Sequence, residues 1–273
     1  MQESIIFAAA QVTLTLVILL YASWSDYKTR EVSNRVWVIY APIALALSLA
    51  GLLLFEPSQL PFYGLSFGVT AGFALLLFYA GGFGGADSKA LMCIALSLPF
   101  APVVLLTPII AGAISPTSQI IFPITIFGNA VLFAAASGIY MIIRNVIWHQ
   151  KTKTKMFQGT LASESIAKKL IVLITGYRMS VSKLKEKWHI FPLEDIEDDK
   201  GNLKRKLVVV PHDDEGREKI VERLSKATEE SKIDGYVWAT PGLPMLIFVT
   251  LGLIVALLLG DFVWLLVRFV LGG

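Results

Sequence analysis

Cysteine and histidine are scarce in this chain. Its 273 residues include one cysteine, Cys93, and three histidines. A single thiol excludes an internal disulfide framework and any zinc site built from paired Cys-x-x-Cys motifs. The formal net charge of +3 gives no basis for nucleic-acid binding. We therefore predict no metal, no cofactor and no nucleic-acid partner.

Charge is nearly absent from the first half of the chain. Residues 1–143 contain four Lys or Arg and five Asp or Glu, whereas residues 144–240 hold 19 of the 24 basic and 15 of the 21 acidic side chains. The first stretch has the composition of a membrane protein and the second that of a water-exposed segment. The N-terminal residues include Glu3 but no base, which is not typical of a signal peptide, so the first apolar run is predicted to be a retained helix.

Six segments are long and apolar enough to cross a membrane, which takes about 20 residues. They lie at residues 4–24, 36–55, 60–80, 88–110, 120–143 and 243–260. The fourth contains three prolines and is the least regular, because each proline removes a backbone donor. The predicted fold class is an all-α polytopic membrane protein with six transmembrane helices and a small α+β insert before the last helix.

Basic residues in the short loops predict the orientation. The first connection holds Lys28, Arg30 and Arg35, whereas the connections at 56–59 and 115–119 hold no base. Cytoplasmic loops carry the excess of Lys and Arg. We therefore expect a cell-membrane protein whose N-terminus is outside and whose first connection and large insert are cytoplasmic.

Three parts follow from this reading: a five-helix membrane part at 1–147, a soluble cytoplasmic insert at 148–240, and a sixth helix with a C-terminal interfacial segment at 241–273. The insert is predicted to contain an amphipathic helix at 163–179, a strand at 207–210, a polar helix at 213–231 and a strand at 236–238. The basic cluster at 151–155 is predicted to meet anionic membrane lipids, with recognition of the soluble part of a substrate as the alternative.

A lone carboxylate, Asp87, follows the glycine-rich stretch Gly-Gly-Phe-Gly-Gly between two apolar segments. An acid at the rim of a membrane segment is costly and is a candidate functional residue. Asp26 ends the first predicted helix, two crossings away, so both carboxylates are expected at the same membrane face. Two adjacent carboxylates share a proton and supply a base to activate water and an acid for the leaving group. Glycines such as Gly84 and Gly85 let an extended substrate approach.

Alternatives remain open at this stage. Asp87 alone could cap the helix that follows it, and Asp26 alone could be a solvated loop acid. The pair could serve an aspartyl endopeptidase, or it could be the ion or proton site of a transporter or channel. Lys89 is interpreted as a snorkelling side chain or a neighbour of the pair. Asp261 is expected at the outer interface, paired with Arg268.

Three separated stretches resemble the archaeal preflagellin (prearchaellin) peptidases, which belong with the type IV prepilin peptidases among the GxGD membrane aspartyl proteases. They are Asp26-Tyr-Lys-Thr-Arg-Glu-Val-Ser-Asn-Arg-Val-Trp37, Phe83-Gly-Gly-Ala-Asp-Ser-Lys89 and Trp238-Ala-Thr-Pro-Gly-Leu-Pro244 with Gly260-Asp261. The resemblance covers nearly the whole chain, and the three motifs occur in the same order.

The resemblance implies an endopeptidase that removes the short basic leader, a class III signal peptide, from archaellin or type IV pilin-like precursors at the cytoplasmic membrane face. Asp26 and Asp87 would be the catalytic pair, with Gly84, Gly85, Ala86 and Lys89 as the surrounding motif. The family pattern Gly-x-Gly-Asp has Ala86 in place of its second glycine. A positive φ at that position would strain an alanine.

Overall fold

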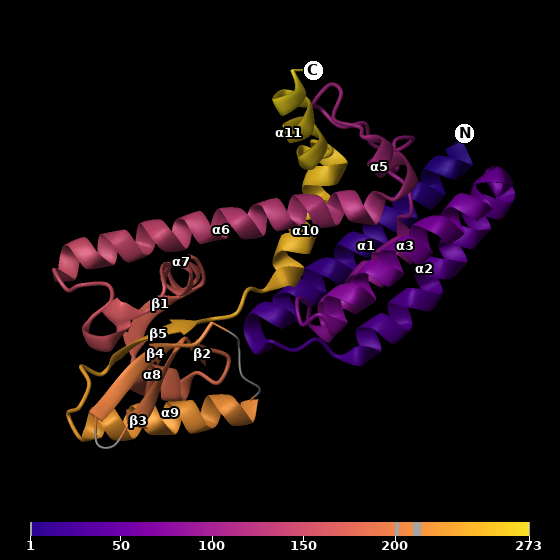
Figure 1. The fold of residues 1–273 in the computed structure, drawn as a ribbon. Helices are drawn as coiled ribbons and strands as arrows, with labels where there is room; N and C mark the ends of the chain where they lie inside the picture. Colours follow the sequence, from indigo (N-terminus) through magenta and orange to yellow (C-terminus); the bar gives the residue numbers. More distant parts are fainter. Residues whose placement is uncertain (1, 200–201, 210–213, 273) are drawn as a thin grey trace. The chain divides into compact units, whose positions relative to one another are not determined.

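The computed structural model describes residues 2–199, 202–209 and 214–272, and it is mostly helical (Figure 1). The chain divides into two compact units, which we call the helical unit (residues 1–134 and 244–273) and the insert unit (residues 135–243). One long helix, α6, begins in the first unit and ends in the second.

Long apolar helices dominate the helical unit. Its elements are α1 (Gln2–Thr29), α2 (Asn34–Phe55), the 3-10 turn η1 (Pro57–Gln59), α3 (Leu60–Tyr79), α4 (Gly85–Ser97), α5 (Pro116–Ile120), the first part of α6 (Phe122–Thr152), α10 (Met245–Leu258) and α11 (Phe262–Leu271). The side chain of Ser33 accepts a hydrogen bond from the Arg35 N–H and caps the start of α2.

By length and composition, four stretches of the described chain could each cross a membrane: α1, α2, η1 with α3, and α6. The pair α10 and α11, bent by 64° at a short break, makes a fifth if it counts as one span. These spans indicate a multi-pass membrane protein. The predicted number of six spans is not confirmed.

The fourth predicted span, residues 88–110, is not one helix. The helix α4 has 13 residues and ends at Ser97, about 20 Å from its start. Pro99 and Pro102 follow at once, and proline cannot donate the backbone hydrogen bonds that would continue a helix. Residues 98–115 are therefore irregular, with α5 after them.

The core of the helical unit lies between α1, α2, α4 and α10. Leu19, Tyr40, Ile94 and Leu253 are each fully buried there. Hydroxyl groups link the same helices: Tyr40 donates to Thr15 Oγ1 at 2.8 Å, which lies 2.9 Å from Ser97 Oγ. Ser23 Oγ on α1 lies 2.7 Å from Thr250 Oγ1 on α10. These buried polar groups are paired across helices, so they fix the helices' axial positions.

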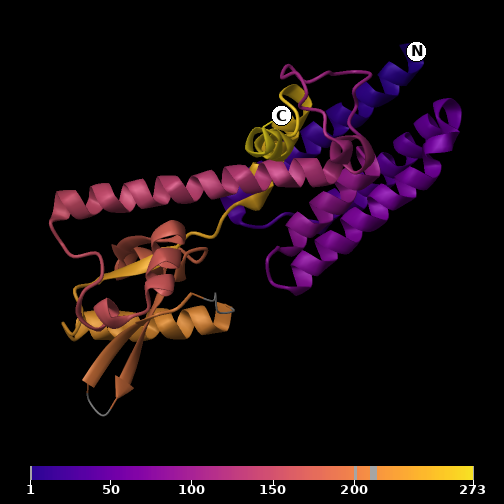
Figure 2. The ribbon, with the colours of Figure 1, turned by 45° about the horizontal axis from the view of Figure 1, so that its top comes forward.

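The insert unit contains two small sheets and short helices. An antiparallel sheet has the strand order β1 (Tyr177–Ser180), β5 (Tyr236–Thr240), β2 (Phe191–Pro192), and a separate antiparallel hairpin joins β3 (Glu194–Asp199) to β4 (Asn202–Leu207). The helical elements are η2 (Gly159–Ser163), α7 (Ile166–Thr175), α8 (Val181–Glu186) and α9 (Asp214–Glu229). Figure 2 shows α9 and the hairpin, both orange, side by side.

The α+β character predicted for the insert is confirmed, with shifted boundaries. The helix expected at 163–179 is α7, which ends at Thr175 because β1 begins two residues later. The strand expected at 207–210 overlaps β4 only at Leu207; Val210 lies outside the described residues. The polar helix expected at 213–231 is α9, and Asp213 also lies outside the described residues. The expected strand at 236–238 is part of β5.

Candidate active site

The glycine run forms the turn between α3 and α4. The N–H groups of Gly81 and Gly82 donate to the carbonyl oxygens of Phe78 and Leu77 at 3.0 and 2.9 Å. This pair of bonds is the Schellman pattern that ends many helices, and Gly81 has the left-handed φ of +75° that it requires. Phe83 then buries its ring against Phe127, with centroids 5.6 Å apart.

Asp87 lies in the first turn of α4, and its side chain turns back toward the chain before the helix. Its Oδ2 accepts a hydrogen bond from the Gly84 N–H at 3.1 Å. The capping role considered from the sequence is thus present, although Gly84 occupies the N-cap position and Asp87 is the third helical residue. A Cβ on Gly84 would lie 3.1 Å from Oδ2. The glycine therefore allows this carboxylate to approach the backbone.

Asp26 lies on the last turn of α1, followed by a tight connection. Arg30 adopts a φ of +56°, and its N–H donates to the Asp26 carbonyl at 3.0 Å. Ser25 Oγ and Thr29 Oγ1 both donate to the Glu31 carbonyl, at 2.7 and 3.0 Å. The Asp26 carboxylate is partly buried and interacts electrostatically with Arg30. Local hydrogen bonds therefore fix the conformation of the connection that follows this acid.

The two carboxylates lie at the same level of the helical unit. Thr15 of α1 and Ser97 of α4 are in contact, with their hydroxyl oxygens 2.9 Å apart. From that contact, Asp26 and Asp87 lie about 16 and 15 Å away along their helices, at 1.5 Å per residue. Asp26 also acts electrostatically on Asp87. The helices therefore run antiparallel, and the two acids lie near each other at one end of the pair.

The rest of the predicted motif surrounds Asp87. Lys89 Nζ donates to the Asn34 side-chain oxygen at 2.6 Å, which ties α4 to the first residue of α2. Ala86 is helical, has no positive φ, and packs against the core of the unit. The strain considered for an alanine at this position is absent. A Cβ on Gly85 would make only an ordinary contact, at 3.8 Å from the Phe78 ring.

Asn34 is the site residue that sequence reasoning missed. It lies in the first resembling stretch, eight residues after Asp26. The available signal was its position at the start of a helix beside the predicted pair. Its contact with Lys89 depends on how α2 and α4 are rotated, which a sequence pattern does not give.

The interpretation of Asp261 as a residue paired with Arg268 is wrong. Asp261 is buried and caps α11: its carboxylate accepts hydrogen bonds from Ser115 Oγ at 2.6 Å, Thr125 Oγ1 at 3.2 Å and the Trp264 N–H at 3.0 Å. Arg268 instead donates to the Gly112 carbonyl. The cause is the break between α10 and α11, which leaves the first N–H groups of α11 in need of an acceptor.

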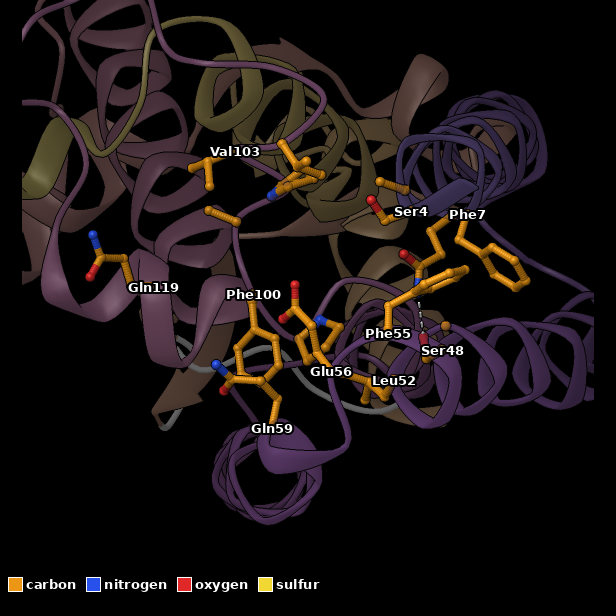
Figure 3. Close-up of a pocket in the computed structure, with 17 residues that line it drawn as sticks. Ser4, Phe7, Ser48, Leu52, Phe55, Glu56, Gln59, Phe100, Val103 and Gln119 are labelled. Atoms are coloured by element: carbon orange, nitrogen blue, oxygen red, sulfur yellow. Dashed lines mark hydrogen bonds between the residues drawn. The ribbon is translucent and has the colours of Figure 1, made fainter. Parts of the chain in front are cut away.

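A cavity of about 330 Å³ opens elsewhere in the helical unit (Figure 3). Its lining comes from the start of α1, the end of α2 and the segment after α4, and includes Phe7, Gln11, Phe55, Glu56 and Phe100. This is the end of α1 opposite to Asp26. Among the described residues that line it there is neither carboxylate of the candidate pair, so we do not assign it to the active site.

Two carboxylates at the same end of a pair of helices can perform acid–base chemistry once they come together. Like charges at short distance cannot both ionise comfortably, so two such carboxylates in contact would hold one proton between them. Such a pair can deprotonate a water molecule and protonate a leaving amine. Both side chains are only partly buried, so a substrate can reach them.

Comparison with protein families gives two matches that together extend over most of the chain. Residues 13–143 match the model described as the type IV leader peptidase family, and residues 168–262 match the archaeal peptidase A24 C-terminus type II model. The first match contains both Asp26 and Asp87. The second covers most of the insert and α10.

Curated relatives agree with these models. Preflagellin peptidases of Methanococcus voltae and Methanocaldococcus jannaschii are 28% and 27% identical to this chain, covering 89% of it and 92% and 91% of their own lengths. The preflagellin peptidase of Methanococcus maripaludis is 23% identical, again with 89% of this chain covered. The chain is a protease of the type IV leader peptidase family, on the archaeal preflagellin peptidase branch.

Proposed function

We propose that this protein is a membrane-embedded aspartyl endopeptidase that removes the leader peptide from preflagellin, with Asp26 and Asp87 as the catalytic pair. The observation that carries the proposal is the placement of two carboxylates at one level of α1 and α4, within electrostatic range. Family membership supports proteolysis, and the relatives' names support preflagellin as the substrate.

The reaction needs one proton shared by the two acids. The ionised carboxylate takes a proton from water, and the water oxygen attacks the carbonyl carbon of the scissile peptide. The carbon–nitrogen bond then breaks as the protonated carboxyl gives its proton to the leaving amine. The pair ends with one proton, as it began, and no covalent intermediate forms.

We also propose a topology with six crossings. The fourth would combine α4 with the irregular segment 98–115 and α5, and the polar backbone of that segment must then be buried in protein. The N-terminus would lie outside, and Asp26, Asp87 and the insert (148–240) would be cytoplasmic, as the basic residues of the first connection favour. Labelling of single cysteines placed in the loops from each side of sealed vesicles tests this topology.

The catalytic assignment is tested with a cleavage assay on membrane fractions. Asp26→Asn and Asp87→Asn should each lower the cleavage rate of a preflagellin precursor by about 10³-fold, because a positioned acid or base contributes roughly 10²–10⁴. Glu56→Gln is the matched control. Glu56 follows the end of α2 that is opposite to Asn34, and it lines the separate cavity. A precursor that is still shortened by both Asn variants would refute the pair.

The comparisons lend no support to a transporter or channel that uses the same acids. The two functions differ in the fate of the substrate, because only the peptidase releases a discrete leader. Class III leaders of type IV pilin-like precursors form the second substrate class to test. Membrane lipids are the further partner that we propose.

A further inference from the structure

Helix α7 in the insert unit exposes an apolar face. Ile166, Leu170, Ile171 and Ile174 are 75%, 52%, 44% and 41% exposed. With about 100° between successive residues, these side chains lie within an arc of roughly 140°. Val172 points away from that arc and is fully buried. A continuous apolar face of this kind marks an interaction surface.

Helix α6 holds α7 at a defined place. The Asn145 side chain on α6 donates to the carbonyl oxygens of Leu173 and Gly176, at 3.0 and 2.8 Å. Gly138, two turns earlier on α6, leaves room for Ile174: a Cβ there would lie 2.7 Å from Ile174 Cγ2. The contact with α7 therefore covers residues 138–145 of α6, as the two adjacent helices in Figure 1 illustrate.

A membrane span that begins at Phe122 would place this contact where α6 leaves the hydrocarbon core. A span of about 20 residues from Phe122 reaches the far side of a 30 Å core near residue 141. Exposed apolar side chains continue a short way beyond that residue, and basic residues follow. The apolar ones are Ile142, Ile143, Val146 and Ile147. An amphipathic helix attached at this level lies at the membrane interface.

The charges around α7 suit anionic headgroups. Residues 144–163 contain Arg144, Lys151, Lys153 and Lys155 and no acid. On α7 itself, Lys168 and Lys169 flank the apolar arc on its two sides, from which long basic side chains can reach a headgroup layer. In the structure Lys169 Nζ donates to the Ala162 carbonyl at 2.5 Å. Lys168 also pairs with Glu164 at 3.0 Å, so the local charge is reduced but remains positive.

We propose that α7 is an in-plane membrane anchor, with Ile166, Leu170, Ile171 and Ile174 inserted at the acyl boundary of the leaflet where α6 ends and anionic lipid headgroups around the flanking lysines. The anchor rests on the membrane insertion of α6 and not on the assignment of the catalytic pair. Its failure and that of the proposed reaction are therefore separable.

Spin labelling of the full chain in proteoliposomes of phosphatidylcholine and phosphatidylglycerol tests the anchor. Cys93, the sole native cysteine, is buried, so unsubstituted protein supplies the labelling background. A label is placed at Leu170→Cys and, in a second protein, at Ile174→Cys. Glu222→Cys on α9 is the matched control, because it is an exposed helical position of the insert unit among charged neighbours.

The labels at 170 and 174 should be severalfold more accessible to oxygen, relative to a water-soluble nickel complex, than the label at 222. This contrast should shrink in vesicles of phosphatidylcholine alone. Equal nickel accessibility at 170, 174 and 222 would overturn the anchor, because α7 would then face water. Spectral broadening that disappears on dilution with unlabelled protein would also overturn it, by showing a second copy on this face.

Discussion

At the scale of single residues, the position of Asp87 depends on the absence of a side chain at Gly84. The Gly84 N–H holds the Asp87 carboxylate at 3.1 Å, and an added Cβ would meet the same oxygen at 3.1 Å. The φ of Gly84 is −72°, which any residue can adopt, so the backbone conformation does not require glycine. Glycine is needed at this position because the carboxylate comes so close to the backbone. The left-handed turn that needs glycine is instead made by Gly81.

Gly84→Ala should displace the Asp87 carboxylate by a few tenths of an ångström and lower kcat/KM for precursor cleavage by roughly tenfold, since misplacing a reacting group is costly. Gly82→Ala is the control, because its Cβ would meet the Leu77 carbonyl at an ordinary 3.5 Å. Steady-state kinetics of the two variants, normalised to folded protein, check this. Equal rates would show that Gly84 does not position the acid.

The bond between Lys89 and Asn34 should act as a positioning contact for the pair. Lys89→Met or Asn34→Ala should each lower cleavage about fivefold, equivalent to roughly 1 kcal/mol for a partly exposed charged hydrogen bond. The double variant should be no slower than either single one, because both remove the same contact. Effects that add in this double-mutant cycle would indicate that the two residues act separately.

At the scale of elements, the sequence predicted where α1, α2, α3, α6 and α10 lie, because long apolar runs leave few alternatives in a membrane. It did not predict the early end of α4 at Ser97. The apolar composition continues past Ser97, so it does not mark the end of the helix. The end depends on the prolines that follow and on which groups can bind the backbone carbonyls that no longer have a helical partner. One such partner is Ser66, whose hydroxyl donates to the Pro99 carbonyl at 2.9 Å.

In the insert unit, the buried Glu194 depends on Arg205. Glu194 accepts from Arg205 at 2.6 Å and from the Trp238 N–H at 2.9 Å. Arg205→Ala should destabilise the insert by about 3–5 kcal/mol, because an unpaired buried charge remains. Lys206→Ala, which removes an exposed pair with Glu197, should cost less than about 1 kcal/mol. Hydrogen–deuterium exchange of the β-strand peptides measures both.

This destabilisation should depend on pH. Burial raises the pKa of Glu194 even though the charge and hydrogen bonds of Arg205 oppose the rise. Loss of Arg205 removes that opposition and raises the pKa further. A carboxyl whose pKa is raised on folding loses stability as the pH increases through that value. The defect of Arg205→Ala should therefore be largest at neutral pH and shrink on acidification, and a defect that grows on acidification would contradict this account.

At the scale of the whole molecule, Asp261 joins segments that are far apart in the chain. Its carboxylate binds Ser115, Thr125 and the start of α11, while the Asn129 side chain donates to the Gly260 carbonyl at 2.9 Å and accepts from the Phe262 N–H. These contacts fix the bend between α10 and α11. The residue is therefore a structural acid.

Asp261→Ala should lower the free energy of unfolding by about 1–3 kcal/mol, because it leaves a buried helix start and two hydroxyl groups without their acceptor. Asp261→Asn keeps one acceptor oxygen and should lower the free energy of unfolding by less than Asp261→Ala does. Cleavage per folded molecule should stay near that of the wild type. Thermal unfolding in detergent alongside the cleavage assay separates these effects, and a stable but inactive Asp261→Ala protein would move the catalytic role to this acid.

The sequence by itself determined the class of the molecule: apolar runs separated by few charges require membrane helices, and the concentration of charge after residue 143 requires a water-exposed insert. It also predicted that Asp26 and Asp87 share a face, because an even number of crossings separates them. Only the tertiary structure decided that they lie at one level, that Lys89 reaches Asn34, and that Asp261 is buried away from Arg268. Those contacts depend on the rotation and axial offset of packed helices, which are set by side chains distant in the chain and have no local pattern.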